Sequence, residues 1–188
     1  MGSSIGLGFQ TIIELMDGYS SKWGFSISDM SSNIIGSSLF AGQELLFDKQ
    51  ILLPKFSYHN TPYSDLRPEV LGSNQIEKIL KNYNGQTYWI SFSPKSFLNN
   101  LPIPEWLCFS FGYSIDQRIY GDQNIAIFQD QEYISKKEFL FSLDIDLSKI
   151  KCKNTFVKTI LNQLNYIKIP LPTVLFSDNK ATFYPIYF

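Results

Sequence analysis

The sequence has little of what metal centres and covalent catalysis require. Its 188 residues include a single histidine, His59, and two cysteines, Cys108 and Cys152. Zinc sites usually draw on several histidines or on closely spaced cysteines, and these two cysteines lie far apart in the chain. No Gly-x-Ser-x-Gly motif accompanies His59, so we do not expect a hydrolase triad. The sequence therefore predicts no metal site, no cofactor and no disulfide, with both thiols buried or idle.

Neither sign of charge dominates the chain, which has 16 basic and 17 acidic residues. Without a basic excess there is no electrostatic case for a nucleic-acid partner. Long apolar runs are missing too, since no run reaches the roughly 18 residues that a transmembrane helix needs. The chain opens without the basic region and cleavage site of a signal peptide, and residues 1–4 lead almost directly into an apolar segment. We therefore expect the sequence to be an N-terminally truncated part of a longer protein.

Aromatic residues are plentiful, at 16% of the chain, and they favour strands and interfaces, including the headgroup belt of membrane proteins. Residues 107–115 and 139–147 alternate strictly between large apolar and small or polar side chains. This alternation is typical of a half-buried antiparallel sheet and also of strands that face lipid. The sequence predicts clear strands at 87–93, 106–115, 138–147 and 182–188, and weaker ones at 51–58, 125–128 and 173–176.

Two sets of charged residues lie in and after the second alternating run. Asp144 and Asp146 should project from one face of the strand, where two carboxylates could bind a hard cation or, more commonly, face solvent. Lys149, Lys151 and Lys153 continue the two-residue spacing. They fit either contact with anionic lipid headgroups or a solvated sheet edge that lysines protect.

Two helices are predicted before the strands. The first covers residues 5–16 and ends at Asp17-Gly18, and the second runs from the capping arrangement at Ser26 to about Phe47. We expect an α+β fold in a single domain, in which an N-terminal helical hairpin packs with an antiparallel sheet of four to seven strands. The hairpin would occupy residues 1–47 and the sheet residues 48–188, with one further helix near 68–82. The alternative is a small outer-membrane-type β-barrel with N-terminal helices.

Four polar residues stand out on these otherwise apolar helices: Glu14, Asp17, Asp29 and Asn33. In an antiparallel hairpin they would converge near the connecting end, where close carboxylates raise one another's pKa. They are therefore candidate catalytic residues, as an acid/base pair or a cation site. The structural alternative, which we favour, is that Asp29 caps its helix, Asp17 binds loop amides and Asn33 bridges backbones.

Five blocks of the chain resemble a Gram-negative envelope family related to the YfiM lipoproteins. The first block is also similar, more distantly, to a helical segment of VanZ-like membrane proteins. The blocks are Ile13-Glu14-x-x-Asp17-Gly18-Tyr19-Ser20-x-Lys22-Trp23-Gly24-Phe25-Ser26, Asp29-x-x-x-Asn33-x-x-Gly36, Leu66-Arg67-Pro68-Glu69-Val70-Leu71-Gly72, Tyr83-Asn84-Gly85-Gln86-Thr87-Tyr88-Trp89 and Ser142-Leu143-Asp144-Ile145-Asp146-Leu147.

The resemblance implies a cell-envelope location, on the periplasmic side of or within the outer membrane, and it implies no defined reaction. Members of that family carry an upstream signal sequence and an Asp-Lys-x-x-His helix, both absent from this sequence. Within the blocks, the candidate binding residues are Trp23, Arg67, Asn84, Gln86 and Trp89.

Two functional hypotheses follow. The first is a non-enzymatic envelope protein that serves as a lipid or partner interface, with outer-membrane lipid or another envelope protein as its partner. The alternative is a lipid- or cell-wall-directed enzyme that uses the carboxylate cluster of the helical hairpin.

Overall fold

The structure is a computed structural model that describes residues 27–98, 100–121 and 123–188, with side chains from Met30 onward. The chain divides into two compact units, Met1–Ile51 and Leu52–Phe188. In the first unit, helix α2 (Ile27–Phe47) ends where the sequence predicts. The other predicted helix, at 5–16, lies outside the described residues, so the helical hairpin stays a prediction. None of the helices in the described part of the chain has the length and apolar character needed to cross a membrane.

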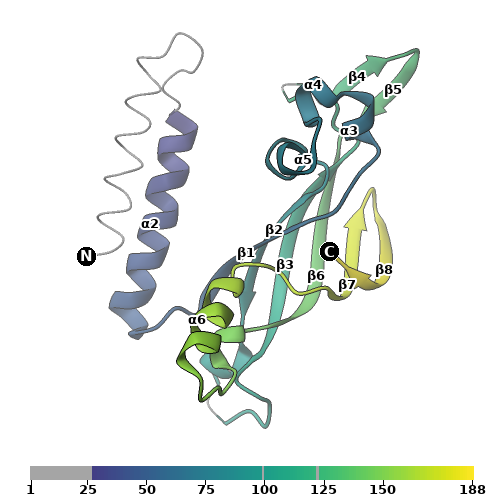
Figure 1. The fold of residues 1–188 in the computed structure, drawn as a ribbon. Coiled ribbons are helices and arrows are strands. Elements are labelled where there is room, and N and C mark those ends of the chain that lie inside the picture. The colour runs from purple at the N-terminus through teal and green to yellow at the C-terminus, as the bar shows by residue number, and fades with distance from the viewer. Residues whose placement is uncertain (1–26, 99, 122) are drawn as a thin grey trace. The chain divides into compact units, whose positions relative to one another are not determined.

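The second unit is built on a six-stranded antiparallel sheet with the strand order β1-β2-β3-β6-β7-β8 (Figure 1). This confirms the predicted α+β class and a strand number within the expected range. Among the described residues the sheet is open, with β1 and β8 at its ends, so the alternative of a closed barrel is wrong. The strands are β1 (Leu52–Tyr58), β2 (Gln86–Phe92), β3 (Leu107–Asp116), β6 (Lys136–Ile145), β7 (Leu171–Ser177) and β8 (Lys180–Tyr187).

Short elements lie at the two ends of this sheet. Figure 1 shows helices α3, α4 and α5 and a separate two-stranded hairpin at one end, and α6 at the other. The sequence predicted β4 but not β5, α3 or α6. These elements are α3 (Tyr63–Leu66), α4 (Pro68–Leu71), α5 (Gln75–Lys81), β4 (Ile125–Phe128), β5 (Gln131–Ile134) and α6 (Thr155–Leu164), with single 3-10 turns η1 (Pro94–Ser96) and η2 (Leu147–Lys149).

The helix predicted near 68–82 is two helices, α4 and α5. Gly72 breaks the run because its φ of 102° lies in a region that side chains disfavour. A Cβ there would also lie 2.5 Å from the backbone carbonyl carbon of Glu77. Asn74 then starts α5, since its side-chain oxygen accepts a hydrogen bond from the amide of Glu77.

The sheet buries most of its small and polar side chains and exposes many of its large apolar ones. On β3, Cys108, Ser110 and Gly112 are buried, whereas Phe111 is 55% exposed. The predicted alternation is confirmed, and it is the apolar side that faces outward. We call the buried side the inner face and the other side the outer face.

A small apolar core lies on the inner face, centred on the indole of Trp89. Gly112 lies directly opposite Trp89 in the β2–β3 pair, and a Cβ at Gly112 would come within 2.7 Å of the indole ring. The end of β8 reaches this core, because the Tyr187 hydroxyl lies 3.4 Å from the Thr87 hydroxyl and its ring contacts Trp89. The remaining core residues are Leu140 and Leu175.

Candidate functional site

The outer face carries two rows of apolar residues that each cross all six strands. Successive members of a row are directly paired on neighbouring strands, so their side chains project side by side. The first row is Pro54, Ile90, Phe111, Phe141, Val174 and Phe183, and the second is Phe56, Tyr88, Tyr113, Phe139, Phe176 and Ala181.

These rings contact one another along and between the rows. The ring centroids of Phe111 and Phe141 are 5.2 Å apart, and those of Tyr113 and Phe139 are 5.7 Å apart. Phe109 extends the surface, because its ring stacks on Phe141 at 5.7 Å. Soluble monomers rarely expose apolar patches of this extent. The outer face is therefore a continuous apolar surface that is rich in aromatic rings.

Polar residues bound the outer face where β1 and β2 meet α5 and where β6 begins. Gln86 lies two residues before Tyr88 on the same side of β2, and its amide donates to the Ile79 carbonyl at 2.7 Å. Lys137 occupies the corresponding outward position on β6, opposite Ile115. Polar groups thus lie next to the second row, at this end of the strands.

The inner face holds a buried ion cluster. Lys55 Nζ lies 2.8 Å from Asp144 Oδ2, with both side chains 0% exposed, and Lys168 Nζ lies 3.8 Å from Asp144 Oδ1. The Ser91 hydroxyl also donates to Asp144, at 2.7 Å. Burial lowers the pKa of the Lys168 amine to about 8, against the opposing effect of the Asp144 carboxylate. The buried charge of Asp144 is thus compensated by two lysines, which hold β1, β6 and the segment before β7 together.

Lys168 also contacts a serine, in an arrangement that is known to activate hydroxyl groups. Its Nζ donates to Ser142 Oγ at 3.2 Å, and a lysine with a lowered pKa can act as a base. Both side chains are buried, however, and the Ser142 hydroxyl donates to backbone carbonyls while accepting from Thr173. Because a substrate cannot reach the hydroxyl, we assign this pair to the packing of the inner face.

The prediction of a solvated face for Asp144 and Asp146 is wrong. Asp144 is fully buried in the ion cluster, and Asp146 binds Ser148 and the side-chain amide of Asn165. The bulky side chains of these strands point outward, and the inner face is the buried side of the sheet. Both carboxylates are therefore shielded from water. Within the part of the chain that the structure describes, no group of three or more histidine, cysteine or acidic side chains could hold a metal ion.

A cavity of about 360 Å³ opens on the inner face where β3 ends and β6 begins. Burial, and next the negative charge of Asp116, raise the pKa of the Glu138 carboxyl to about 7. Burial lowers the pKa of His59 in the same cavity. Near neutral pH the Glu138 carboxyl can therefore change its protonation state. The aromatic part of the lining comes from the C-terminal strand, through Tyr184 and Tyr187.

The predicted carboxylate cluster falls mostly outside the described residues. Glu14 and Asp17 lie there, as does the candidate binding residue Trp23. Asp29 lies near the start of α2 in a part whose side chains are not described, and Asn33, one turn later, is half-buried. The cluster therefore stays a prediction.

The other candidate binding residues do not form one site. Arg67 binds Glu69 at 2.7 Å, and its guanidinium lies 4.2 Å from the ring centre of Tyr120. Trp89 is in the core and donates from its indole nitrogen to the Ser57 hydroxyl at 3.0 Å. Both residues are therefore engaged in holding the fold.

Asn84 and Gln86 flank the start of β2 and are buried. The Asn84 side chain exchanges two hydrogen bonds of 2.7 Å with the backbone of Arg118, which fixes the loop after β3. Asn84 also lines the cavity beside Glu138, whereas Gln86 ties β2 to α5. Asn84 thus borders a cavity that a ligand could enter.

Sequence reasoning missed several residues that define these surfaces. Lys168 has a visible signal, since it is a lone charge between Ile167 and Ile169. Glu138 and Asp116 carry no such signal, because their proximity depends on how β3 and β6 pair. The same holds for the continuity of the outer rows.

Comparison with known proteins yields no match: neither a protein-family model, nor a curated protein, nor a solved structure is similar to this chain. The interpretation of its surfaces therefore rests on their own geometry and chemistry.

Proposed function

We propose that the protein is a non-enzymatic lipid-binding protein whose outer face lies against the acyl chains of a membrane. The observation that carries the proposal is the sheet's burial pattern, which exposes uninterrupted apolar rows rich in aromatic residues and buries serines and an ion cluster. In water this arrangement leaves apolar area unburied that an acyl-chain environment would cover.

The chemistry of the rows favours lipid over a protein partner. Protein interfaces form about one hydrogen bond per 100–200 Å² and have a polar rim. In the two rows the only polar groups are the hydroxyls of Tyr88 and Tyr113, which lie next to the polar end of the face. Acyl chains need no hydrogen bonds, and tyrosines are favoured where acyl chains meet headgroups.

Sedimentation with neutral phosphatidylcholine vesicles tests the proposal. We expect the wild type to sediment with vesicles and Phe111→Gln/Phe183→Gln to lose about five- to tenfold in affinity per residue, because only the exposed half of each side chain remains to be buried. Burying one phenylalanine is worth about 1.5–3 kcal/mol, and both rings are more than half exposed. The matched control is Ile125→Gln/Ile127→Gln, which changes two exposed apolar residues on the β4–β5 hairpin and should leave binding intact.

Three outcomes would contradict lipid binding. One is equal loss in both double variants, and another is no sedimentation of the wild type. The third is a concentration-dependent dimer in light scattering that Phe111→Gln/Phe183→Gln abolishes, which would assign the outer face to a second copy of the chain. The outer-membrane location that the resemblance implies stays a prediction, and lipid binding does not depend on it.

A further inference from the structure

A second cavity, of about 650 Å³, lies at the end of the sheet opposite the polar boundary of the outer face. It forms where β2 ends, β3 begins and β6 ends. Three lysines contribute to its lining, Lys95 from η1, Lys149 from η2 and Lys151 from the loop that follows. Trp106, which is 40% exposed, is the aromatic part of the lining.

The positive charge of this cavity is mostly uncompensated. Neither Lys149 nor Lys151 forms an ion pair with any carboxylate in the described part of the chain, and Lys95 donates only to the Ile103 carbonyl, at 3.3 Å. Glu105 is the one acidic residue of the lining, so the lining lysines exceed the acidic charge by two. An anion is the ligand that this balance favours.

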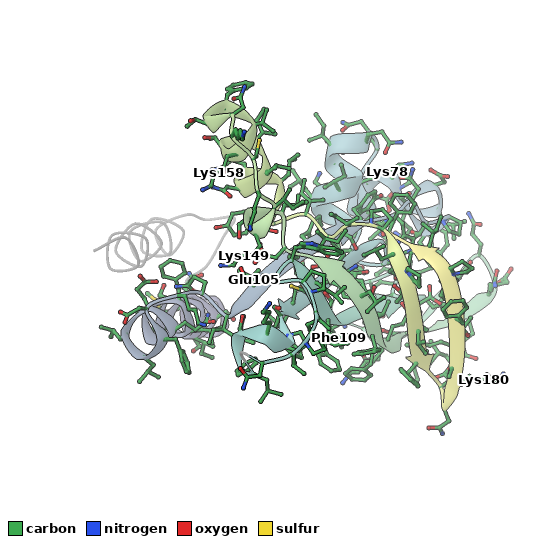
Figure 2. All side chains as sticks on the ribbon, turned by 90° about the horizontal axis from the view of Figure 1, so that it is seen from below. Lys78, Glu105, Phe109, Lys149, Lys158 and Lys180 are labelled. Carbon is green, nitrogen blue, oxygen red and sulfur yellow. The ribbon has the colours of Figure 1, made fainter. Side chains whose placement is uncertain are left out.

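The cavity is continuous with the outer face. Ile145 is the last outward residue of β6, in line with Leu143 and Phe141, and it also lines the cavity. Figure 2 labels Glu105 and Lys149 of the cavity lining and Phe109 of the outer face. A ligand with an anionic head and an apolar tail could therefore place its head among the lysines and its tail along the rings.

We propose that this cavity binds the phosphate-bearing headgroup of an anionic phospholipid whose acyl chains lie on the outer face. The inference rests on the proposed lipid binding and adds the class of lipid. Lysine ammonium groups bind phosphate as point charges, and a tryptophan at the boundary between headgroups and acyl chains is in its preferred environment.

The test measures binding of the whole protein to phosphatidylcholine vesicles with and without phosphatidylglycerol, at low salt. The variant Lys149→Gln/Lys151→Gln should lose about fivefold in affinity per lysine on the anionic vesicles and nothing on the neutral ones. Its matched control is Lys158→Gln/Lys180→Gln, which removes the same charge from exposed sites outside the cavity, also labelled in Figure 2.

A variant that is expected to bind more tightly shows that the losses in the other variants do not come from misfolding. Glu105→Gln removes the only acidic side chain of the lining and should tighten binding to anionic vesicles a few-fold. The tryptophan fluorescence should shift to shorter wavelength on these vesicles, and Trp106→Phe should abolish that part of the shift. Both readouts report on the cavity itself.

Each remaining outcome separates the inference from the proposed function. Equal losses in the cavity and control double variants would mean general electrostatic attraction and would overturn the headgroup site, as would equal affinity of the wild type for both kinds of vesicle. Displacement of the protein from anionic vesicles by millimolar inorganic phosphate would also overturn it in favour of a free-phosphate site. No binding to either vesicle would instead refute the proposed lipid binding.

Discussion

Lys55 on β1 forms its ion pair with Asp144 on β6 across two intervening strands, with 2.8 Å between Nζ and Oδ2. The contact is possible because the intervening strands present Ser91 and Ser110 on this face, which are short enough for the lysine to pass over. Their hydroxyls contact each other, and Ser91 donates to the same carboxylate. The small residues of the inner face thus make room for buried charges beside its apolar core.

The first prediction concerns the carboxylate of that cluster. Asp144→Asn should lower the free energy of unfolding by about 3–5 kcal/mol, because it leaves Lys55 and Lys168 buried without a counter-charge. The matched control is Asp65→Asn, which breaks an exposed 2.7 Å pair with Lys78 and should cost less than about 1 kcal/mol. Urea unfolding measures both, and equal effects would show that the buried charges are compensated in another way.

The second prediction concerns the pH dependence of stability through Glu138. Its pKa is raised to about 7 in the folded protein, by burial and then by the charge of Asp116, with Lys136 opposing the shift. The folded state therefore holds its proton more tightly than the unfolded state, and stability present below about pH 4.5 is lost as the pH rises through 7.

Glu138→Gln should remove that loss. The variant should gain about 1–2 kcal/mol relative to the wild type between pH 4.5 and pH 8, after allowance for the screening of a partly exposed carboxyl. Urea unfolding at both pH values gives the difference. An identical pH dependence in the two proteins would mean that Glu138 titrates normally.

The third prediction concerns Gly112. A methyl group there would lie 2.7 Å from the Trp89 ring, so Gly112→Ala should displace the indole and cost about 1–3 kcal/mol. Gly121→Ala is the control, since no described atom lies within 4 Å of a Cβ at that position. Thermal unfolding compares the two. A neutral Gly112→Ala would show that the core around Trp89 is loosely packed.

The fourth prediction concerns the two thiols. Burial, and then the charges of Asp146 and Asp144, raise the pKa of Cys108 to about 12, so it should resist a thiol reagent at pH 8. Cys152 is only half-buried and should react. Cys152→Ser should therefore abolish rapid labelling of the native protein, whereas Cys108→Ser should leave it unchanged. Rapid labelling of Cys108 would contradict its burial.

The strands and their faces were largely predictable from the sequence. The alternation in residues 107–115 and 139–147 is local information, and it correctly separated Phe111 from Ser110. It left open which face would be buried. Which face is buried is decided by tertiary contacts such as the ion pair between Lys55 and Asp144. These two residues are 89 positions apart in the chain, so no local sequence pattern predicts their contact.

The surfaces were less predictable than the strands for the same reason. Asn84 was a candidate binding residue and does line a cavity, but Glu138 beside it was not foreseen, because only the pairing of β3 with β6 brings Glu138 there. Lys149 and Lys151 were considered for lipid headgroups on spacing alone. Their cavity needs η1 as well, and η1 lies more than 50 residues earlier in the chain.

The contact between Gly112 and Trp89 has a consequence for how β2 and β3 find each other during folding. Strict alternation penalises a slip of one residue, which would exchange the two faces, but it does not distinguish the correct pairing from a slip of two. A slip of two residues would bring Ser110 or Ser114 opposite Trp89, and the Cβ of either serine would clash with the indole ring. Gly112 is the only glycine in the six strands. Gly112 therefore favours the observed register of β2 and β3 over the other registers that the alternation alone would allow.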